Sequence, residues 1–235
     1  MSEPGHAALD PPAGPPLVFV ADLHQPTLDA DDLHHLARVL RVREGALCTI
    51  SDGQGRWRAA RFAAEPDPVG PIVEVPPPNP PLAIGFALLK GDRTELVVQK
   101  LTELGVDRIV PLMTDRTIAR PDPARAAKLV ERLRRIAREA CMQSRRCRFP
   151  RIESVTPFDE VVGEPGVALA DRAGESPDLS HPFVLVGPEG GWAPRERGMA
   201  PHVVGLGRHV LRAETAALAA GALLAALREG RQPES

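Results

Sequence analysis

Apolar residues follow two different rhythms along this chain of 235 residues. Within residues 17–75 they occur in short runs bounded by turns, as in half-buried strands. One stretch differs: after Asp31 and Asp32, which favour a helix start, apolar residues from Leu33 to Leu40 recur at helical spacing. The expected strands are residues 17–20, 47–50, 57–62 and 72–75. This pattern predicts a compact, mostly β unit with one helix.

From residue 82 onward, strand-like and helix-like segments alternate. The expected strands are residues 82–89, 108–113, 167–170, 183–186 and 202–206, and the expected helices are 94–104, 123–145 and 214–228. Gly105 is placed to end the first of these helices. Such alternation predicts an α/β fold, in which helices cover a parallel sheet.

A proline-rich segment separates the two patterns. Residues 75–81 hold five prolines in seven positions, which favours a stiff, extended connector. We therefore expect a β domain at residues 1–76, a linker at 76–81 and an α/β domain at 82–235. The alternative is a proline-rich loop within a single domain.

The composition is that of an ordinary globular protein, with 43% hydrophobic and 26% charged residues. The net charge of −2 means that any surface for nucleic acid must be local. No apolar run approaches the roughly 20 residues of a membrane span, and the N-terminus lacks the pattern of a signal peptide. Cys48, Cys141 and Cys147 are odd in number and form no Cys-x-x-Cys pair, so we expect a reduced, cytoplasmic, metal-free protein.

Two loops near the C-terminus carry the clearest chemical signal. Residues 184–192 read Val-Leu-Val-Gly-Pro-Glu-Gly-Gly-Trp, and residues 206–216 read Leu-Gly-Arg-His-Val-Leu-Arg-Ala-Glu-Thr-Ala. Glycine has no Cβ, so such loops let a backbone approach a ligand closely. Together they predict a composite pocket for a flat, nucleoside-sized ligand. The alternative is that residues 187–191 form only a tight turn.

The charge of the first loop narrows the ligand class. Glu189 in its centre would repel a phosphate, and the chain has neither a Walker A sequence nor a strand-linked Gly-x-Gly-x-x-Gly. The pocket therefore suits a neutral or cationic ligand, such as an adenosyl sulfonium.

A local basic cluster lies in residues 125–151, where ten Lys or Arg residues accompany only Glu131 and Glu139. Such a cluster in a nearly neutral protein is typical of a phosphate-backbone contact. The alternative is a solvated helix face in an arginine-rich sequence. Phe149 is the one aromatic residue nearby, so base stacking on this surface is not supported.

Several blocks, taken in order, resemble the RsmE-type methyltransferases of the SPOUT superfamily. These blocks are Lys90-Gly-Asp-Arg93, Gln99-Lys-Leu-Thr-Glu-Leu-Gly-Val106, Pro111-Leu112, Asp115-Arg-Thr117, Gln143-Ser-x-Arg146 with Pro150, Gly187-Pro-Glu-Gly-Gly-Trp-x-x-x-Glu196, and Leu206-Gly-x-x-x-Leu-Arg-x-Glu-Thr-Ala216. The segment His34-His-Leu-x-x-Val-Leu-Arg41 resembles that family's PUA-like domain. The resemblance covers residues 17–228.

The resemblance implies S-adenosylmethionine-dependent methylation of N3 of a uridine in 16S ribosomal RNA. Naked RNA and the assembled small subunit are both open as substrates, and the modest basic surface without a stacking platform favours the assembled particle. The resemblance also implies a SPOUT-type α/β domain with a C-terminal trefoil knot, a small PUA-like β-barrel domain and a homodimer. The usual connection rules exclude knots, so the knot comes from the resemblance alone. Met142 stands where the family commonly has Glu, which excludes an essential carboxylate there.

The pair of glycine loops, with the small residues Ala213, Ala216 and Ala217 beside them, leads to the hypothesis that S-adenosylmethionine binds between these loops. The expected cofactor-binding residues are Leu185, Val186, Gly187, Glu189, Gly190, Gly191, Leu206, Gly207, Leu211, Arg212, Glu214, Thr215 and Ala216. The expected RNA-binding residues are His34, Arg38, Arg41, Arg138, Gln143, Arg145 and Arg146.

Uracil N3 must lose a proton before it accepts a methyl group. Arg212 and Arg116 are the candidates to favour the uracil anion, and Glu214 or Glu139 is the candidate proton acceptor. Alternatively, Arg212 pairs with Glu214 or Glu189 at the helix start, and Glu214 only complements the helix dipole.

Two other functions fit the same sequence. A non-catalytic RNA-binding ribosome-assembly factor would account for the basic segment and the β domain. A knotted methyltransferase acting on another RNA would account for the glycine loops as well.

Overall fold

The computed structural model describes residues 10–230, which form two compact units. The first comprises residues 10–77 together with 138–149, and the second comprises residues 78–137 together with 150–230. Among the described residues, no helix is both long and apolar enough to cross a membrane.

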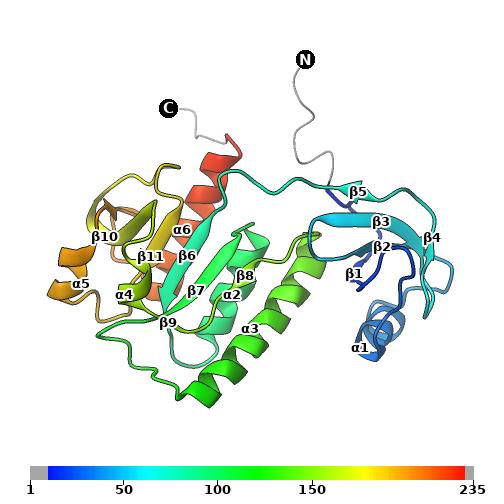
Figure 1. The fold of residues 1–235 in the computed structure, drawn as a ribbon, viewed down its shortest axis with the longest axis horizontal. Helices are drawn as coiled ribbons and strands as arrows, with labels where there is room; N and C mark the ends of the chain where they lie inside the picture. The colour runs from blue at the N-terminus through cyan, green and yellow to red at the C-terminus, as the bar shows by residue number, and fades with distance from the viewer. Residues whose placement is uncertain (1–9, 231–235) are drawn as a thin grey trace. The chain divides into compact units, whose positions relative to one another are not determined.

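The first unit is a mixed five-stranded sheet with one helical segment (Figure 1). Its strands are β1 (Leu17–Phe19), β2 (Leu47–Ser51), β3 (Arg56–Arg61), β4 (Asp67–Pro68) and β5 (Val73–Glu74). They lie in the order β1-β2-β3-β4, with β5 paired to β3, and all pairs except β1 with β2 are antiparallel. Helix α1 (Ala30–His34) continues into one π-helical turn, η2 (His35–Val39). The predicted β unit with one helix is confirmed.

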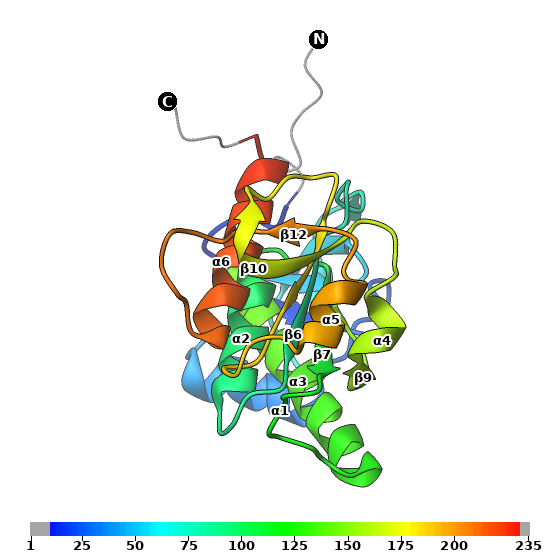
Figure 2. The ribbon, with the colours of Figure 1, turned by 90° about the vertical axis from the view of Figure 1, so that its left-hand side faces the viewer.

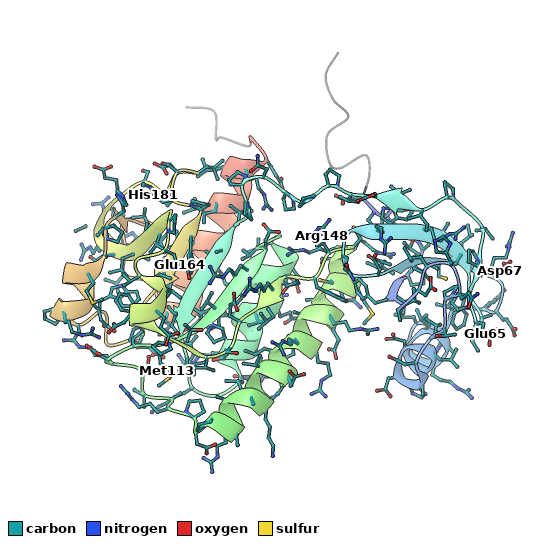
Figure 3. All side chains as sticks on the ribbon, in the orientation of Figure 1. Glu65, Asp67, Met113, Arg148, Glu164 and His181 are labelled. Carbon is teal, nitrogen blue, oxygen red and sulfur yellow. The ribbon has the colours of Figure 1, made fainter. Side chains whose placement is uncertain are left out.

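The segment 138–149 joins this unit although it follows far later in the chain. The carbonyl of Cys147 accepts hydrogen bonds from the Ser51 hydroxyl and the Gly55 amide, both at 3.0 Å. Arg148 donates to the carbonyl of Val75 at 2.9 Å (Figure 3). These bonds tie the segment to the Ser51 side chain at the end of β2 and to main-chain groups of Gly55 and Val75, which flank β3 and β5, so the segment completes the β unit.

The second unit contains a seven-stranded sheet in which every pairing is parallel. Its strands are β6 (Ala83–Ala87), β7 (Arg108–Met113), β8 (Arg151–Ile152), β9 (Thr156–Pro157), β10 (Val167–Glu175), β11 (Phe183–Val186) and β12 (Val203–Val204). The order is β12-β10-β11-β6-β7-β8, with β9 paired to β7. The predicted parallel α/β sheet is confirmed, whereas the trefoil knot and the closure of the β domain into a barrel stay predictions.

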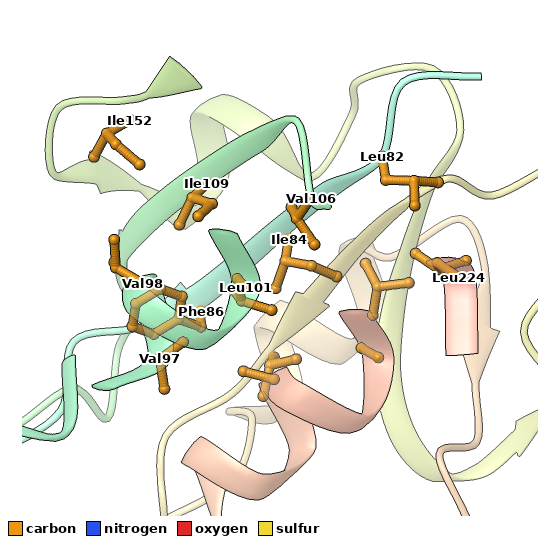
Figure 4. Close-up of a cluster of buried hydrophobic side chains, with 14 of the residues drawn as sticks. Leu82, Ile84, Phe86, Val97, Val98, Leu101, Val106, Ile109, Ile152 and Leu224 are labelled. Carbon is orange, nitrogen blue, oxygen red and sulfur yellow. The ribbon is translucent and has the colours of Figure 1, made fainter. Parts of the chain in front are cut away.

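Five helices accompany these strands: α2 (Arg93–Glu103), α3 (Pro123–Ser144), α4 (Phe158–Val161), α5 (Pro194–Met199) and α6 (Ala213–Arg228). Figure 2 shows α2 and α6 on one side of the sheet and α4 and α5 on the other. The larger core lies under α2 and α6, where Ile84 and Phe86 of β6 meet Leu101 and Leu224 (Figure 4). Gly221 lets the two helices approach, because a Cβ there would lie 2.7 Å from a methyl carbon of Leu101.

The backbones of β10 and the end of β12 cross at very short range. A Cβ on Gly174 would lie 2.4 Å from the carbonyl carbon of Val204, and one on Gly205 would lie 2.6 Å from the carbonyl oxygen of Gly174. The Gly205 amide donates to the carbonyl of Glu175 at 2.7 Å. This crossing directs the chain into the loop that precedes α6.

Candidate functional site

A cavity of about 250 Å³ lies where the chain leaves β11 and β12, beside the bend in β10. Its volume is close to the lower end of the roughly 300–1,000 Å³ of small-molecule sites, and carboxyl ends of parallel strands are where such sites form. The lining residues are Ala170, Asp171, Arg172, Val186, Gly187, Pro188, Glu189, Gly191, Trp192, Arg197, Leu206, Gly207, His209, Val210, Leu211, Ala213 and Ala216. Both glycine loops thus border one cavity.

Trp192 fixes the first glycine loop. Its indole N–H donates to the carbonyl of Ala170 at 3.0 Å, and its ring packs against Phe158 with centroids 5.1 Å apart. A Cβ on Gly187 would lie 3.0 Å from the indole ring, so glycine permits this contact. Gly191 has a φ of +67°, a conformation that L side chains rarely adopt. The loop is therefore a preformed wall of the cavity.

The second loop ends at α6, whose first residues face the cavity. Arg212 occupies the N-cap position with an extended backbone, and Ala213 and Ala216 line the cavity with small side chains. The Arg212 side chain is exposed and makes no hydrogen bond or ion pair among the described residues.

Arg93 is the residue that pairs with Glu189 and Glu214. One guanidinium nitrogen lies 2.8 Å from a carboxylate oxygen of Glu189 and 3.4 Å from one of Glu214. The alternative role of Arg212, pairing with these two carboxylates, is therefore wrong. Arg93 is the last residue of the block Lys90-Gly-Asp-Arg93, and this block was the one sequence feature that singled it out. No feature of the sequence indicated that Arg93 pairs with these two carboxylates.

The loop after β7 contacts the first glycine loop. Arg116 donates to the carbonyl of Gly190 at 2.8 Å. Glu196 is fully buried and accepts hydrogen bonds from the amides of Asp115 and Ala193, both at 2.8 Å. One buried carboxylate therefore holds the loop after β7 to the start of α5.

Arg195 adds ion pairs to the same junction. It contacts Asp115 at 3.0 Å and Asp159 at 2.8 Å. Hydrogen bonds from Arg195 lower the pKa of Asp115, and hydrogen bonds to Asp115 and then Asp159 raise the pKa of Arg195.

Eight of the thirteen residues expected to bind a cofactor line the cavity: Val186, Gly187, Glu189, Gly191, Leu206, Gly207, Leu211 and Ala216. The other five, Leu185, Gly190, Arg212, Glu214 and Thr215, lie outside its lining. Leu185 is buried in the core of the sheet, and a Cβ on Gly190 would make an ordinary 3.7 Å contact with Arg116. The lining residues of β10, notably Asp171, were missed because that strand carries no glycine-loop signal.

The seven residues expected to bind RNA all belong to the first compact unit. Arg41 and Arg145 have left-handed backbones, with φ of 53° and 62°. Arg145 donates to the carbonyl of Gly14 at 3.0 Å. Exposed positions are taken by His34, Arg38, Arg41 and Gln143.

Arg138 has a structural partner in that unit. It binds Asp32, which is only 5% exposed, with one nitrogen–oxygen distance of 2.9 Å. Met142 packs against the apolar residues of the β unit and lies 3.9 Å from an Arg138 nitrogen. Within residues 10–230, no group of three His, Cys, Asp or Glu side chains has the arrangement of a metal site.

Two family descriptions match the chain. An "RNA methyltransferase domain" matches residues 76–225, and an "RNA methyltransferase PUA domain" matches residues 28–68. "Ribosomal RNA small subunit methyltransferase E" of Mycobacterium bovis is 34% identical over 82% of this chain and 83% of its own length. The protein of the same name from Synechocystis is 32% identical over 86% of this chain and 73% of its own length.

Solved structures resemble the fold over nearly its whole length. The ribosomal RNA small subunit methyltransferase E of Neisseria gonorrhoeae, bound to S-adenosyl methionine, aligns with a TM-score of 0.75 at 29% identity. The alignment covers 89% of this chain and 96% of that protein. A Legionella pneumophila protein in complex with the bound cofactor SAM aligns with a TM-score of 0.76 at 28% identity, over 90% and 97% of the two chains.

Proposed function

The chain belongs to the RNA methyltransferase family, and from that premise we propose that it transfers the methyl group of S-adenosylmethionine to N3 of a uridine in 16S ribosomal RNA. The observation that supports this proposal is the cavity between the two glycine loops, where apolar and small residues lie beside charged ones of both signs, among them Glu189 and Asp171. We infer that the target RNA is that of the small ribosomal subunit from the names of the relatives.

The lining of the cavity fits S-adenosylmethionine. Val186, Leu206 and Leu211 offer apolar surface, while Ala213 and Ala216 leave room for a flat ring. Glu189 and Asp171 also line the cavity, paired with Arg93 and Arg197 respectively. A carboxylate within a few ångströms stabilises a cationic centre, such as the sulfonium of the cofactor. The main chain of residues 186–191 would hold the cofactor on one side, and residues 206–211 on the other. When bound, the cofactor supplies an electrophilic methyl group.

The protein's contribution is orientation and proton handling. Holding both reactants in place can lower the barrier by roughly 7–11 kcal/mol. Arg116 and Arg212 remain our candidates to favour the uracil anion, since a nearby cation stabilises a conjugate base. Arg116 is fixed on the rim by Gly190, and the Arg212 side chain is unengaged. Glu214 remains the candidate proton acceptor, with Arg93 as its ion-pair partner.

The first unit is our candidate for RNA recognition. Its seven expected contact residues come from two distant parts of the sequence and share one compact unit. Arg138 supports this surface indirectly, by binding Asp32 of helix α1. We further infer an assembled small subunit as substrate and a cytoplasmic location.

The first experiment is isothermal titration with S-adenosylmethionine, S-adenosylhomocysteine and ATP. We expect micromolar binding of the two adenosyl ligands and none of ATP, because a triphosphate would meet the Glu189 carboxylate in the first glycine loop. Methylation of small ribosomal subunits, with the modified base mapped to uracil N3, would then test the reaction. Absence of adenosyl binding both free and in the presence of small subunits would favour the assembly-factor function instead.

A homodimer is a separate part of the proposal. We infer it mainly from the resemblance to the family, and helix α6, which is rich in alanine and has Leu223 39% exposed, is the face that we assign to it. Light scattering at micromolar concentration should give about twice the 25.2 kDa of one chain. A monomer mass would remove the dimer from the proposal without affecting the cofactor site.

A further inference from the structure

A second cavity, of about 280 Å³, lies in the same unit at the carboxyl ends of β6 and β7. One wall runs from Leu88 to Thr94, between the end of β6 and the first turn of α2. The other wall runs from Ala119 to Leu129, through the loop after β7 and into α3. Neither the glycine loops nor any residue of the cofactor cavity contributes to it.

The two cavities differ in charge. The lining of the first holds both signs, with Asp171 paired to Arg197 and Glu189 paired to Arg93. Arg120 and Arg125 line the second, and no carboxylate does. Asp122, the nearest acidic neighbour along the chain, caps the start of α3 and pairs with Arg125 at 3.3 Å. Both side chains of that pair are largely exposed, so solvent screens it strongly. The second cavity therefore favours an anion.

Arg120 is held in place before any ligand arrives. Its guanidinium donates to the carbonyls of Thr114, Asp115 and Thr117 at 2.9 to 3.2 Å. Those bonds use Nε and Nη2, and Nη1 makes none among the described residues. Carbonyl partners fix the side chain without cancelling its charge. A fixed guanidinium with free donors is the group best suited to bind a phosphate.

The two cavities share their dividing segments. Gly91 and Thr94 line the second cavity, and Arg93, between them in the sequence, pairs with Glu189 of the first. The loop after β7 likewise borders the second cavity with Arg120, while its Arg116 contacts Gly190 beside the first. A nucleotide strand with one base at the cofactor cavity would thus bring a neighbouring phosphate towards the second.

We propose that this second cavity binds a backbone phosphate of the RNA strand next to the target nucleotide, with Arg120 and Arg125 as its ligands. The inference rests on the proposed RNA methyltransferase function. It assigns this cavity to substrate placement rather than to the cofactor.

The test uses full-length protein carrying Arg120→Met, Arg120→Lys or Arg125→Met. Lys100→Met is the matched control, because Lys100 forms an exposed i,i+3 ion pair with Glu103 near the opposite end of α2. Binding of a 16S ribosomal RNA fragment is measured over a range of KCl concentrations, methylation of small subunits gives kcat/KM, and calorimetry gives the affinity for S-adenosylmethionine.

Each Met variant at the cavity should reduce the salt slope of RNA binding by about 0.7–0.9, the value of one lost phosphate contact. The value of kcat/KM for RNA should fall about tenfold, as for the loss of one charge-assisted hydrogen bond. Arg120→Lys should restore the slope, and S-adenosylmethionine affinity should not change. A structural role alone would leave the salt slope unaltered.

Slopes and kcat/KM equal to those of Lys100→Met would overturn the proposal. Inorganic phosphate provides a second arm: if it binds the wild type and not Arg120→Met while the RNA slope is unchanged, the cavity takes a free anion and the RNA assignment is wrong. Failure of the wild type to bind S-adenosylmethionine would instead count against the proposed function, and the RNA slopes would still report on the cavity.

Discussion

Arg93 lies between two carboxylates from different segments, of which Glu189 lines the cavity and Glu214 lies outside its lining. Glu189 comes from the first glycine loop and Glu214 from the first turn of α6. The side chain of Glu214 is only 14% exposed, so its charge is poorly screened by water. We infer that Arg93 is a positioning residue, which keeps the two segments at the spacing that a ligand requires.

Replacing Arg93 with Met should weaken S-adenosylmethionine binding about fivefold, because a partly exposed ion pair contributes about 1 kcal/mol. Calorimetry measures the change. Adding Glu214→Gln to Arg93→Met should recover part of the affinity, since the repulsion between the two carboxylates is then gone. Lys100→Met is again the control, and equal affinity in Arg93→Met and Lys100→Met would remove the positioning role.

At the level of residues, the sequence indicated two glycine loops that both border one cavity, because glycine loops have a local signature; which of their residues bind the cofactor stays a prediction. Gly187, Gly191 and Gly207 all line or shape the cavity as expected. Long-range partners have no local signature. The spacing of Arg93, Glu189 and Glu214 along the chain does not indicate that their side chains form ion pairs. The hydrogen bond between Glu196 and Asp115 is likewise not predictable from their positions in the sequence.

At the scale of elements, the close approach of β10 to the chain at the end of β12 lies directly before the loop that leads to α6. The two backbones approach so closely that only glycine fits at positions 174 and 205. The amide of Gly205 then donates to Glu175 and fixes the register of the crossing.

Replacing Gly205 with Ala should therefore lower the free energy of unfolding by about 2 kcal/mol or more, because the new methyl group overlaps the carbonyl of Gly174. Urea denaturation gives the value. Gly163→Ala is the matched control, since a Cβ there meets nothing within 4 Å. If both variants unfold at the same urea concentration, the crossing is looser than the structure indicates.

Element prediction succeeded where periodicity extends over many residues. The helix expected at 123–145 is Pro123–Ser144, and the strand expected at 108–113 is Arg108–Met113. Short elements were missed, among them β8, β9 and α4, because two to four residues cannot display a period. The π-helical turn at His35–Val39 was read as ordinary helix, since both place apolar residues at similar spacing.

At the scale of the whole molecule, the lowered pKa values of three carboxyl groups predict how the free energy of unfolding depends on pH. Arg195 lowers the pKa of Asp115, and the Ser180 hydroxyl lowers that of Asp178. For Asp52, burial raises the pKa, but hydrogen bonds from Gln54 and Arg56 outweigh it and the net shift is downward.

A carboxyl group whose pKa is lowered by folding stabilises the protein fully above its unfolded pKa, near 3.8, and loses that contribution as the pH falls through the folded value. We therefore expect stability to decline as the pH falls below about 4. Denaturant unfolding from pH 7 to pH 2.5 measures this. Asp115→Asn should flatten the decline, and an unchanged slope would show that Arg195 does not stabilise the Asp115 carboxylate.

Helix α3 begins in the second compact unit and ends in the first, as one continuous helix of 22 residues. Its last residues and the loop that follows supply Cys141 to the apolar core of the β unit and Cys147 to its hydrogen bonds. Neither unit is therefore formed by one continuous stretch of the sequence. A recombination event at the proline-rich segment would exchange residues 1–77 but leave behind the helix end that completes them, so viable hybrids between relatives must inherit residues 138–149 together with the N-terminal part.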